Sequence, residues 1–356
     1  MTAGACADED PNLLAQCADH EALTIVPDIP LTASTEHIEF HVDDTTFLCA
    51  GSVIDYERFV QYSAAVLDVE LVQRVPVYLF RDVKGYCSET AAACVTPDGT
   101  VFTSPIAAAH ELAHTVSCGW RSGTSPALSE GLAVSFELTP SQSPTDPREF
   151  ITAERAADVD YAGAGHFVRW LLEFHGVAPL REAFLTSPRG GGDAVLDALE
   201  AAYGQDPESL FAEYEASAPY LWVPHRQCAD LERLEPTAGV WAFAATFDCE
   251  DPATLGPWVR AFSAYSDSMY QSFLIDVDTP GTYTFERESD TEVWVERCLD
   301  DVALSEEDAS SMWHKEPVSP LPGAMDVDLA AGIYRVDVLR KHAPPHEVAL
   351  RIERKP

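Results

Sequence analysis

The chain has 356 residues and a formal net charge of −37, because 59 acidic residues face only 22 basic ones. A surface this negative repels phosphate groups, which excludes nucleic acid as a partner. No run approaches the ~18 apolar residues of a membrane span, so we expect a soluble chain. The length suits two domains of ordinary size.

The first part of the chain predicts a small mixed sheet. Residues 1–35 are expected to form an N-terminal segment. Hydrophobic alternation then predicts strands at Ile38–Val42, Val75–Phe80 and Val101–Thr103. Aromatic and aliphatic residues at helical spacing predict a helix over Val53–Val69. The third strand ends just before the most informative motif of the chain.

That motif is His110-Glu111-Leu112-Ala113-His114, which fits H-E-x-x-H. Two imidazoles four residues apart project from one face of a helix and can bind one Zn²⁺. Glu111 lies about 100° round the helix, where it can act as general base on a zinc-activated water. The motif therefore predicts a zinc metallopeptidase in which His110 and His114 are metal ligands and Glu111 is catalytic.

A metal-free surface helix is the alternative interpretation of this motif. The neighbouring residues are small and apolar: Ala107, Ala108, Ala109, Ala113 and Val116. They indicate a buried helix, in which two histidines and a glutamate are costly unless a partner satisfies them. Ser104 and Pro105 predict the helix start, and Cys118-Gly119 predicts its end.

A third ligand is expected downstream, where Pro126–Ala133 predicts a second helix with Glu130 among apolar neighbours. This helix contains Glu130-Gly131-Leu132-Ala133, which resembles the E-G-x-A motif of gluzincin metallopeptidases, the thermolysin-like and aminopeptidase-like enzymes. The resemblance implies that Glu130 is the third zinc ligand, with Glu137 as the competing candidate. The metzincin pattern needs a third histidine where this chain has Trp120, which excludes that class.

Tyr161 opens a Gly/Ala-rich helical run that continues through His166. Aminopeptidase-like gluzincins carry a similar tyrosine, which implies that Tyr161 donates a hydrogen bond to the oxyanion. An ordinary core tyrosine with its hydroxyl at the surface is the alternative. His166 is a second candidate donor, although a packing role fits its apolar surroundings better.

Three further helices are predicted at Leu180–Leu185, Asp193–Tyr203 and Pro207–Ser217, separated by Gly-rich breakers. They are similar to the helical subdomain of gluzincin-like peptidases. The resemblance covers residues 36–218, the expected catalytic domain.

Residues 228–356 predict an all-β domain. Five short alternating runs are bounded by Gly, Pro and Asp: Ser272–Val277, Gly281–Glu286, Glu292–Glu296, Gly332–Leu339 and Glu347–Ile352. The stretches Asp278–Phe285 and Ala331–Val338 resemble the strands of the pre-peptidase C-terminal type of β-sandwich. Another jelly-roll or immunoglobulin-like module is the alternative.

Nine cysteines without any C-x-x-C indicate disulfides in an oxidising compartment. Cys87 and Cys94 form a local pair, and Cys118 is expected to reach Cys49. Cys6 follows a small-residue run compatible with a lipid anchor at the cell surface. Alternatively Cys6 pairs with Cys17, and one of three cysteines in the β domain is free: Cys228, Cys249 or Cys298.

Together these features predict an α+β protein with a thermolysin/aminopeptidase-like catalytic domain followed by a β-sandwich. We expect a secreted, cell-surface or periplasmic zinc metallopeptidase that acts on peptides or proteins. Residues 97–101 lack the G-x-M-x-N signature of the aminopeptidase branch, which favours endopeptidase activity. The alternative is a catalytically silent, metal-stabilised binding or adhesion protein that uses the β domain; Glu111 argues against it.

Overall fold

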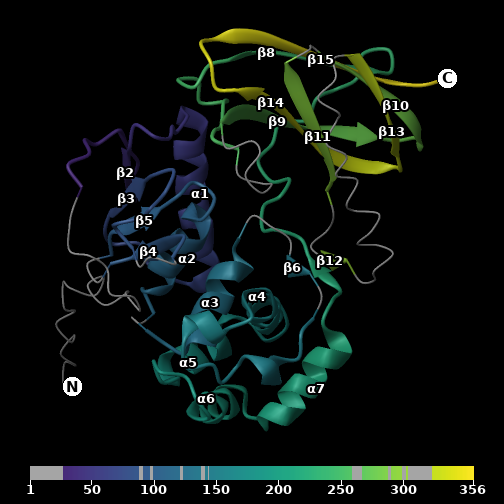
Figure 1. Cartoon of the computed structure of the whole chain (residues 1–356). Coiled ribbons are helices and arrows are strands. Elements are labelled where there is room, and N and C mark those ends of the chain that lie inside the picture. The colour runs from purple at the N-terminus through teal and green to yellow at the C-terminus, as the bar shows by residue number, and fades with distance from the viewer. Residues whose placement is uncertain are drawn as a thin grey trace, which may run out of the picture. The chain divides into compact units, whose positions relative to one another are not determined.

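The computed structural model describes residues 27–87, 91–96, 99–120, 123–137, 141–142, 144–258, 267–287, 290–298, 302–303 and 323–356. The chain divides into two compact units (Figure 1). The first contains residues up to Asp43, Glu57–Phe136 and Pro144–Ala218. The second contains Asp44–Tyr56, Glu137–Ser143 and Pro219–Pro356. The architecture is α+β, as predicted.

The first unit contains a five-stranded sheet in the order β1-β2-β3-β5-β4. Its strands are β1 (Ala33–Ser34), β2 (Ile38–Val42), β3 (Val75–Leu79), β4 (Ala93–Val95) and β5 (Val101–Thr103). Strands β2, β3 and β5 are parallel, while β1 and β4 are antiparallel edge strands. The three parallel strands were predicted within one residue, and the two edge strands were not predicted. The helix between β2 and β3 is α1 (Ala50–Leu67).

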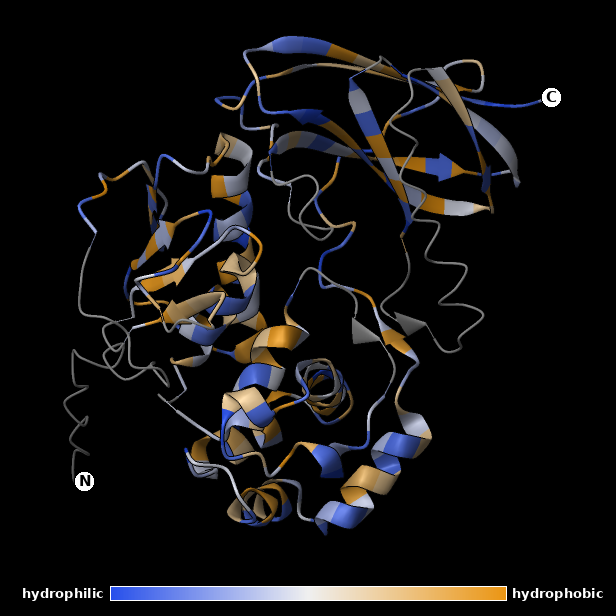
Figure 2. Cartoon of the chain, viewed as in Figure 1, coloured by the Kyte–Doolittle hydropathy of each residue, from blue (hydrophilic) through white to orange (hydrophobic). Residues whose placement is uncertain are grey.

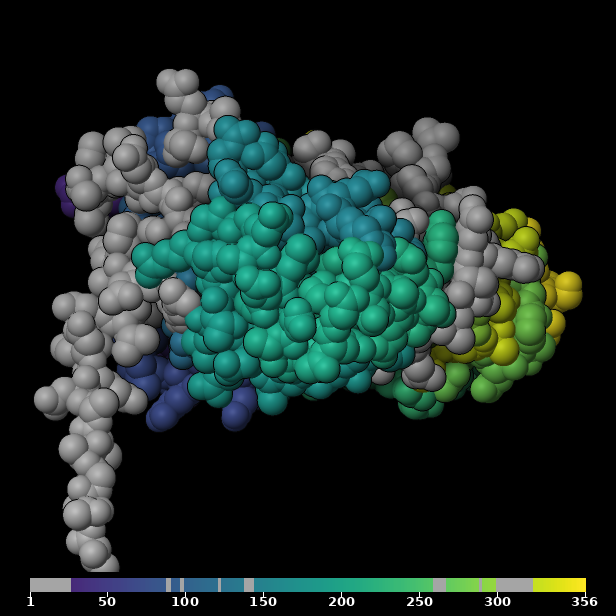
Figure 3. All heavy atoms as spheres, turned by 90° about the horizontal axis from the view of Figure 1, so that it is seen from below, coloured from purple at the N-terminus to yellow at the C-terminus, as the bar shows by residue number. Residues whose placement is uncertain are grey.

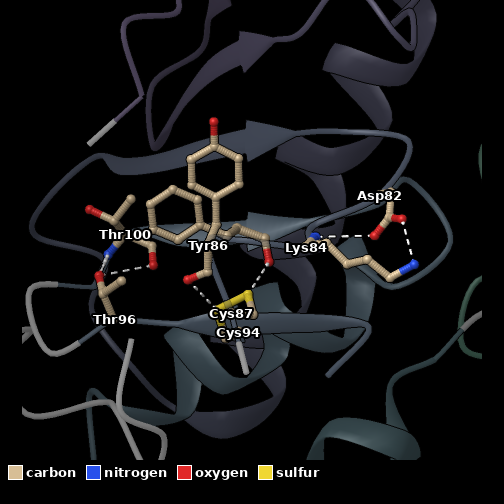
Figure 4. Close-up of a disulfide and its surroundings, with 8 residues drawn as sticks. Asp82, Lys84, Tyr86, Cys87, Cys94, Thr96 and Thr100 are labelled. Atoms are coloured by element: carbon tan, nitrogen blue, oxygen red, sulfur yellow. Dashed lines mark hydrogen bonds and ion pairs between the residues drawn. A yellow bond between two sulfur atoms is a disulfide. The ribbon is translucent and has the colours of Figure 1, made fainter. Parts of the chain in front are cut away.

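One face of this sheet carries a ladder of aromatic rings. His41, Tyr78 and Phe102 lie opposite one another on β2, β3 and β5, and their rings stack. Tyr86 stacks on Phe102 from the loop before β4. The predicted Cys87–Cys94 disulfide joins this loop to β4 (Figure 4). The disulfide therefore fastens the loop over the aromatic face.

The other helices of the first unit are α2 (Ala108–Ser117), α3 (Pro126–Ser135), α4 (Tyr161–Trp170), α5 (Val177–Thr186), α6 (Ala194–Tyr203) and α7 (Pro207–Ser217). Single 3₁₀ turns occur at Pro147–Glu149 and Ala156–Asp158, and a π-helical turn, Leu171–His175, follows α4. Helix α2 packs on β4 and β5, and α3 packs on both α2 and α4. Seen from below, the segment α5–α7 forms the teal and green surface of this unit (Figure 3).

Helix α2 begins later than predicted. Ser104 was expected to cap it, but residues 105–107 form a turn in which the Ala107 amide donates to the Ser104 carbonyl. Ala107 is the N-cap and makes no side-chain cap bond. Cys118 follows the last residue of α2, as predicted.

The second unit contains a β-sandwich. One sheet has the order β13-β10-β15-β8, and the other has the order β11-β14-β9. Its strands are β8 (Val240–Phe247), β9 (Ser268–Val277), β10 (Gly281–Arg287), β11 (Thr291–Arg297), β13 (Gly323–Leu329), β14 (Gly332–Lys341) and β15 (His346–Arg354). Apolar side chains from both sheets form one core, and apolar and polar residues alternate along the strands (Figure 2). A small separate sheet joins β6 (Ser141–Gln142), β7 (Leu221–Trp222) and β12 (Val302–Ala303).

The predicted Cys49–Cys118 disulfide is wrong. Cys49 is bonded to Cys249, because the start of α1 pairs with the chain after β8. The Ala50 amide donates to the Cys249 carbonyl at 2.9 Å, and the Gly51 amide donates to the Thr254 carbonyl at 3.0 Å.

The remaining cysteines of the described chain are also bonded. Cys228 pairs with Cys298, and Cys118 is disulfide-bonded as well. None of the three β-domain cysteines is therefore free. Cys6 and Cys17, for which a lipid anchor or a shared disulfide was predicted, lie outside the described residues.

These disulfides indicate an oxidising environment. Within the described ranges, no helix has both the length and the apolar character that crossing a bilayer requires.

Candidate metal centre

Helix α2 places His110 and His114 one turn apart on the same face. Their Nε2 atoms lie 3.1 Å from each other, and their rings stand nearly perpendicular with centroids 4.7 Å apart. This approach follows from the four-residue spacing, which brings two side chains to one face of a helix. Both histidines are partly buried.

Helix α3 brings Glu130 to the same point. Ser125 caps this helix by accepting the Leu128 amide, and Pro126 occupies its first turn. Glu130 Oε2 lies 3.1 Å from His110 Nε2 and 3.3 Å from His114 Nε2. One atom from each of the three residues therefore meets in a compact triangle.

The triangle fits a metal ion. Zinc bonds of about 2.0–2.1 Å at tetrahedral angles place neighbouring ligand atoms roughly 3.3–3.4 Å apart. The observed separations of 3.1–3.3 Å are close to this value. Two imidazoles and one carboxylate with an open position are a donor set of catalytic zinc sites, and they also suit iron(II).

The electrostatics of the centre favour the ionised form of Glu130. Burial alone would raise the pKa of Glu130. The charge of His114 and hydrogen bonds from both histidines outweigh burial and hold the pKa well below its usual range. Glu130 is therefore a carboxylate at neutral pH, which is the form that binds a metal.

Ser129 is a neighbour of the centre that the sequence analysis missed. Its Oγ lies 3.5 Å from Nδ1 of His114. A partner at Nδ1 fixes the ring orientation of a histidine and leaves Nε2 for the metal. Helix α3 thus supplies both the predicted third ligand and a contact to the second histidine. In the sequence, this neighbour could have been found from the position of Ser129 directly before the candidate ligand, Glu130.

Glu111 occupies the position on α2 between the two histidines and is buried. Among the described residues, the group of possible ligands contains His110, His114 and Glu130, and Glu111 is not one of its members.

Tyr161 is the first residue of α4 and lies beside the centre. Its ring stacks on that of His110, with centroids 6.1 Å apart and planes inclined by 24°. The residue is 39% exposed, more than suits a core tyrosine that has only its hydroxyl at the surface. A phenol at this place can donate a hydrogen bond to a molecule that reaches His110.

Three other residues considered from the sequence have different surroundings. His166 is fully buried, and its Nδ1 lies 2.7 Å from the Tyr214 hydroxyl, so it packs α4 against α7. Trp120 is a core residue whose indole donates to the Leu67 carbonyl. Glu137 does not belong to any metal-compatible group found in the described chain.

A second His/Glu group consists of Glu36, His37 and Glu57. Here Nδ1 of His37 lies only 2.6 Å from Glu57 Oε1, and the His37 amide donates to Oε2 at 3.2 Å. Gln61 also donates to Glu57. These contacts already satisfy the carboxylate, and Glu36 is exposed. The group is better explained as a hydrogen-bonded anchor than as a metal site.

Comparison with known proteins gives no further assignment. No protein-family model matches the chain, and no similar curated protein was found.

Proposed function

We propose that this protein is a zinc-dependent peptidase of gluzincin type. The observation that carries the proposal is the triangle of His110, His114 and Glu130, formed by a helix with the H-E-x-x-H motif and by the helix that follows it. A two-histidine, one-carboxylate set could also hold iron(II). A buried glutamate on the helix that carries both histidines favours hydrolysis, because hydrolysis requires a base beside the metal.

The chemistry divides between the metal and the chain. Zinc at this centre would polarise a scissile carbonyl and lower the pKa of a water to about 7. Glu111 accepts a proton from the attacking water and passes it to the leaving amine. His110, His114 and Glu130 would hold the ion, and Ser129 would keep the His114 ring in its orientation.

Tyr161 stabilises the transition state in this proposal. Its position beside His110 and its exposure leave the phenol accessible to a substrate. A hydrogen bond to the oxyanion, formed only as negative charge develops, would lower the barrier without strengthening substrate binding.

The rest of the chain is consistent with a secreted peptidase. The disulfides Cys49–Cys249, Cys87–Cys94 and Cys228–Cys298 suit an extracellular environment. In this proposal the first unit is a thermolysin/aminopeptidase-like catalytic domain. The second unit is an accessory β-sandwich of the pre-peptidase C-terminal type. The substrates are peptides or proteins, and internal cleavage is favoured.

The variant Glu111→Gln tests the proposal. It should keep zinc and the fold but lose turnover of a peptide library by at least 10²–10⁴-fold, the usual contribution of general-base catalysis. Glu182→Gln is the matched control, because it makes the same change at an exposed position of α5.

Undiminished cleavage by Glu111→Gln would remove Glu111 from the mechanism. A zinc-loaded wild type that cleaves no peptide in the library would favour the alternative, a metal-stabilised binding protein. Iron in place of zinc in the purified protein would point to a different reaction.

A further inference from the structure

Helices α3 and α4 approach each other closely at two glycines. A Cβ atom on Gly131 of α3 would lie 2.7 Å from the Ala164 carbonyl oxygen and 2.7 Å from Cγ2 of Val168. A Cβ on Gly165 of α4 would lie 2.3 Å from Cγ1 of Val134. Glycine is unfavourable inside a helix, so its presence at both crossing points indicates that the packing requires it.

The contact at Gly131 lies next to the metal centre, because the preceding residue is Glu130. Binding constellations tolerate displacements of only about 0.5 Å. An alanine at 131 would need to move away from α4 by more than this to reach ordinary contact with the Ala164 oxygen. Since the obstacle is backbone, α3 and α4 must separate.

We propose that Gly131 is a positioning residue for the metal centre. Its missing side chain lets α3 lie directly on the backbone of α4, and this contact sets the distance of Glu130 from His110 and His114. This inference rests on the proposed metal site and adds a reason for the glycine that follows the third ligand.

A second contact holds the two helices in the same arrangement. Arg169 of α4 is buried, and its Nη1 donates to the carbonyl of Ser135, the last residue of α3. Its Nε donates to Glu173 at 2.8 Å. Helix α4 therefore fixes α3 near Gly131 and at its C-terminal end, while its own first residue, Tyr161, lies beside His110.

The two glycines provide a matched comparison. The obstacle to an alanine at Gly165 is the side chain of Val134, with Cγ1 at 2.3 Å and Cβ at 2.7 Å, and a glycine at position 134 removes both atoms. The obstacle at Gly131 includes main chain, which no truncation removes. Gly165→Ala combined with Val134→Gly should therefore restore packing, whereas Gly131→Ala keeps its strain although alanine is the better helix former.

The experiment measures metal binding by metal-free wild type, Gly131→Ala, Gly165→Ala and Gly165→Ala/Val134→Gly. Zinc affinity is determined by competition with a chromophoric chelator, and Co²⁺ absorption reports the ligand geometry. We expect Gly131→Ala to lower zinc affinity at least tenfold and to change the Co²⁺ spectrum. The double variant should show the affinity and spectrum of wild type. Thermal unfolding of the metal-free proteins separates a loss of stability from a loss of geometry.

Val168→Ile is a milder variant that enlarges the same contact, for use if Gly131→Ala does not fold. It should weaken zinc binding by a smaller factor. Wild-type affinity and spectrum in Gly131→Ala, or in Val168→Ile if only that variant folds, would overturn the inference while leaving the proposed function intact. A wild type that binds no zinc would overturn both.

Discussion

Tyr161 gives the sharpest expectation at the scale of single residues. A donor that acts only on the oxyanion affects the transition state and not the ground state. Tyr161→Phe should therefore lower kcat about 10²-fold, with KM nearly unchanged, which corresponds to about 3 kcal/mol. Steady-state kinetics on one peptide substrate measures this.

A structural role for Tyr161 gives a different result. Its loss would then lower the melting temperature and leave kcat near the wild-type value. Tyr86→Phe is a suitable control, because it removes a phenol hydroxyl from a ring that stacks on Phe102.

The residues of the centre differ in how well the sequence predicts them. His110 and His114 follow from a spacing that is local to one helix, so their meeting could be foreseen. Glu130 required the resemblance to gluzincins, because residues on separate helices meet only through tertiary packing. No role was predicted for Ser129 or Gly131. The contact of Ser129 depends on the orientation of the His114 ring, and that of Gly131 depends on how closely α4 approaches α3.

At the scale of elements, the turn before β2 is fastened to α1 through Glu57. This carboxylate accepts from the amide of His37 and from Gln61, and it contacts the His37 ring. Burial raises the pKa of Glu57, but hydrogen bonds from Thr35 and His37 outweigh burial and lower it. The ionised form is therefore favoured in the folded state.

The stability of wild type should depend on this group in acid. The pKa of Glu57 is lower in the folded state than in the unfolded state. The carboxylate's contribution to the free energy of unfolding is therefore complete above the unfolded pKa of about 4.3, and it is lost as pH falls through the folded pKa. Glu57→Gln should cost about 1–3 kcal/mol near pH 7. The difference from wild type should shrink as pH falls below about 4.

Urea unfolding at several pH values measures this difference, with Glu182→Gln as an exposed control. A difference that stays constant down to pH 2 would contradict the role given to the Glu57 carboxylate.

Long periodic elements were predicted better than short ones. The range Pro207–Ser217 matches α7 because an N-cap aspartate and proline mark its start. Strand β1 has two residues, too few for alternation to be recognised. Strand β4 was not predicted, although β5, which also has three residues, was. Strand β8 was not predicted either. All 8 of its residues pair with residues of β15.

At the scale of the whole molecule, the disulfides differ in the length of chain that they close. Cys49–Cys249 spans 200 residues, and Cys87–Cys94 spans 7. Chain-entropy arguments give about 5 kcal/mol for the former and about 2 kcal/mol for the latter. C49A/C249A should therefore lower the unfolding temperature of its unit more than C87A/C94A does. Calorimetry of both double variants measures this, and a smaller effect of C49A/C249A would contradict the argument.

The long-range pairing was beyond prediction from the sequence. Cys49 was assigned to Cys118 because Cys49 follows the first predicted strand and Cys118 ends the H-E-x-x-H helix, so that a bond between them would join the helix to the sheet. The structure instead groups Asp44–Tyr56 with the C-terminal β-sandwich. Periodicity describes local structure and contains no information on which distant segments join one unit.

The central claim is that His110, His114 and Glu130 hold one zinc ion. Anomalous diffraction at the zinc edge, from crystals of zinc-loaded wild type, tests it most directly. We expect one peak bonded to Nε2 of both histidines and to the Glu130 carboxylate at about 2.0–2.2 Å, with a fourth position open. No peak at this triangle, a Glu137 ligand in place of Glu130, or zinc only at Glu36, His37 and Glu57 would contradict the account.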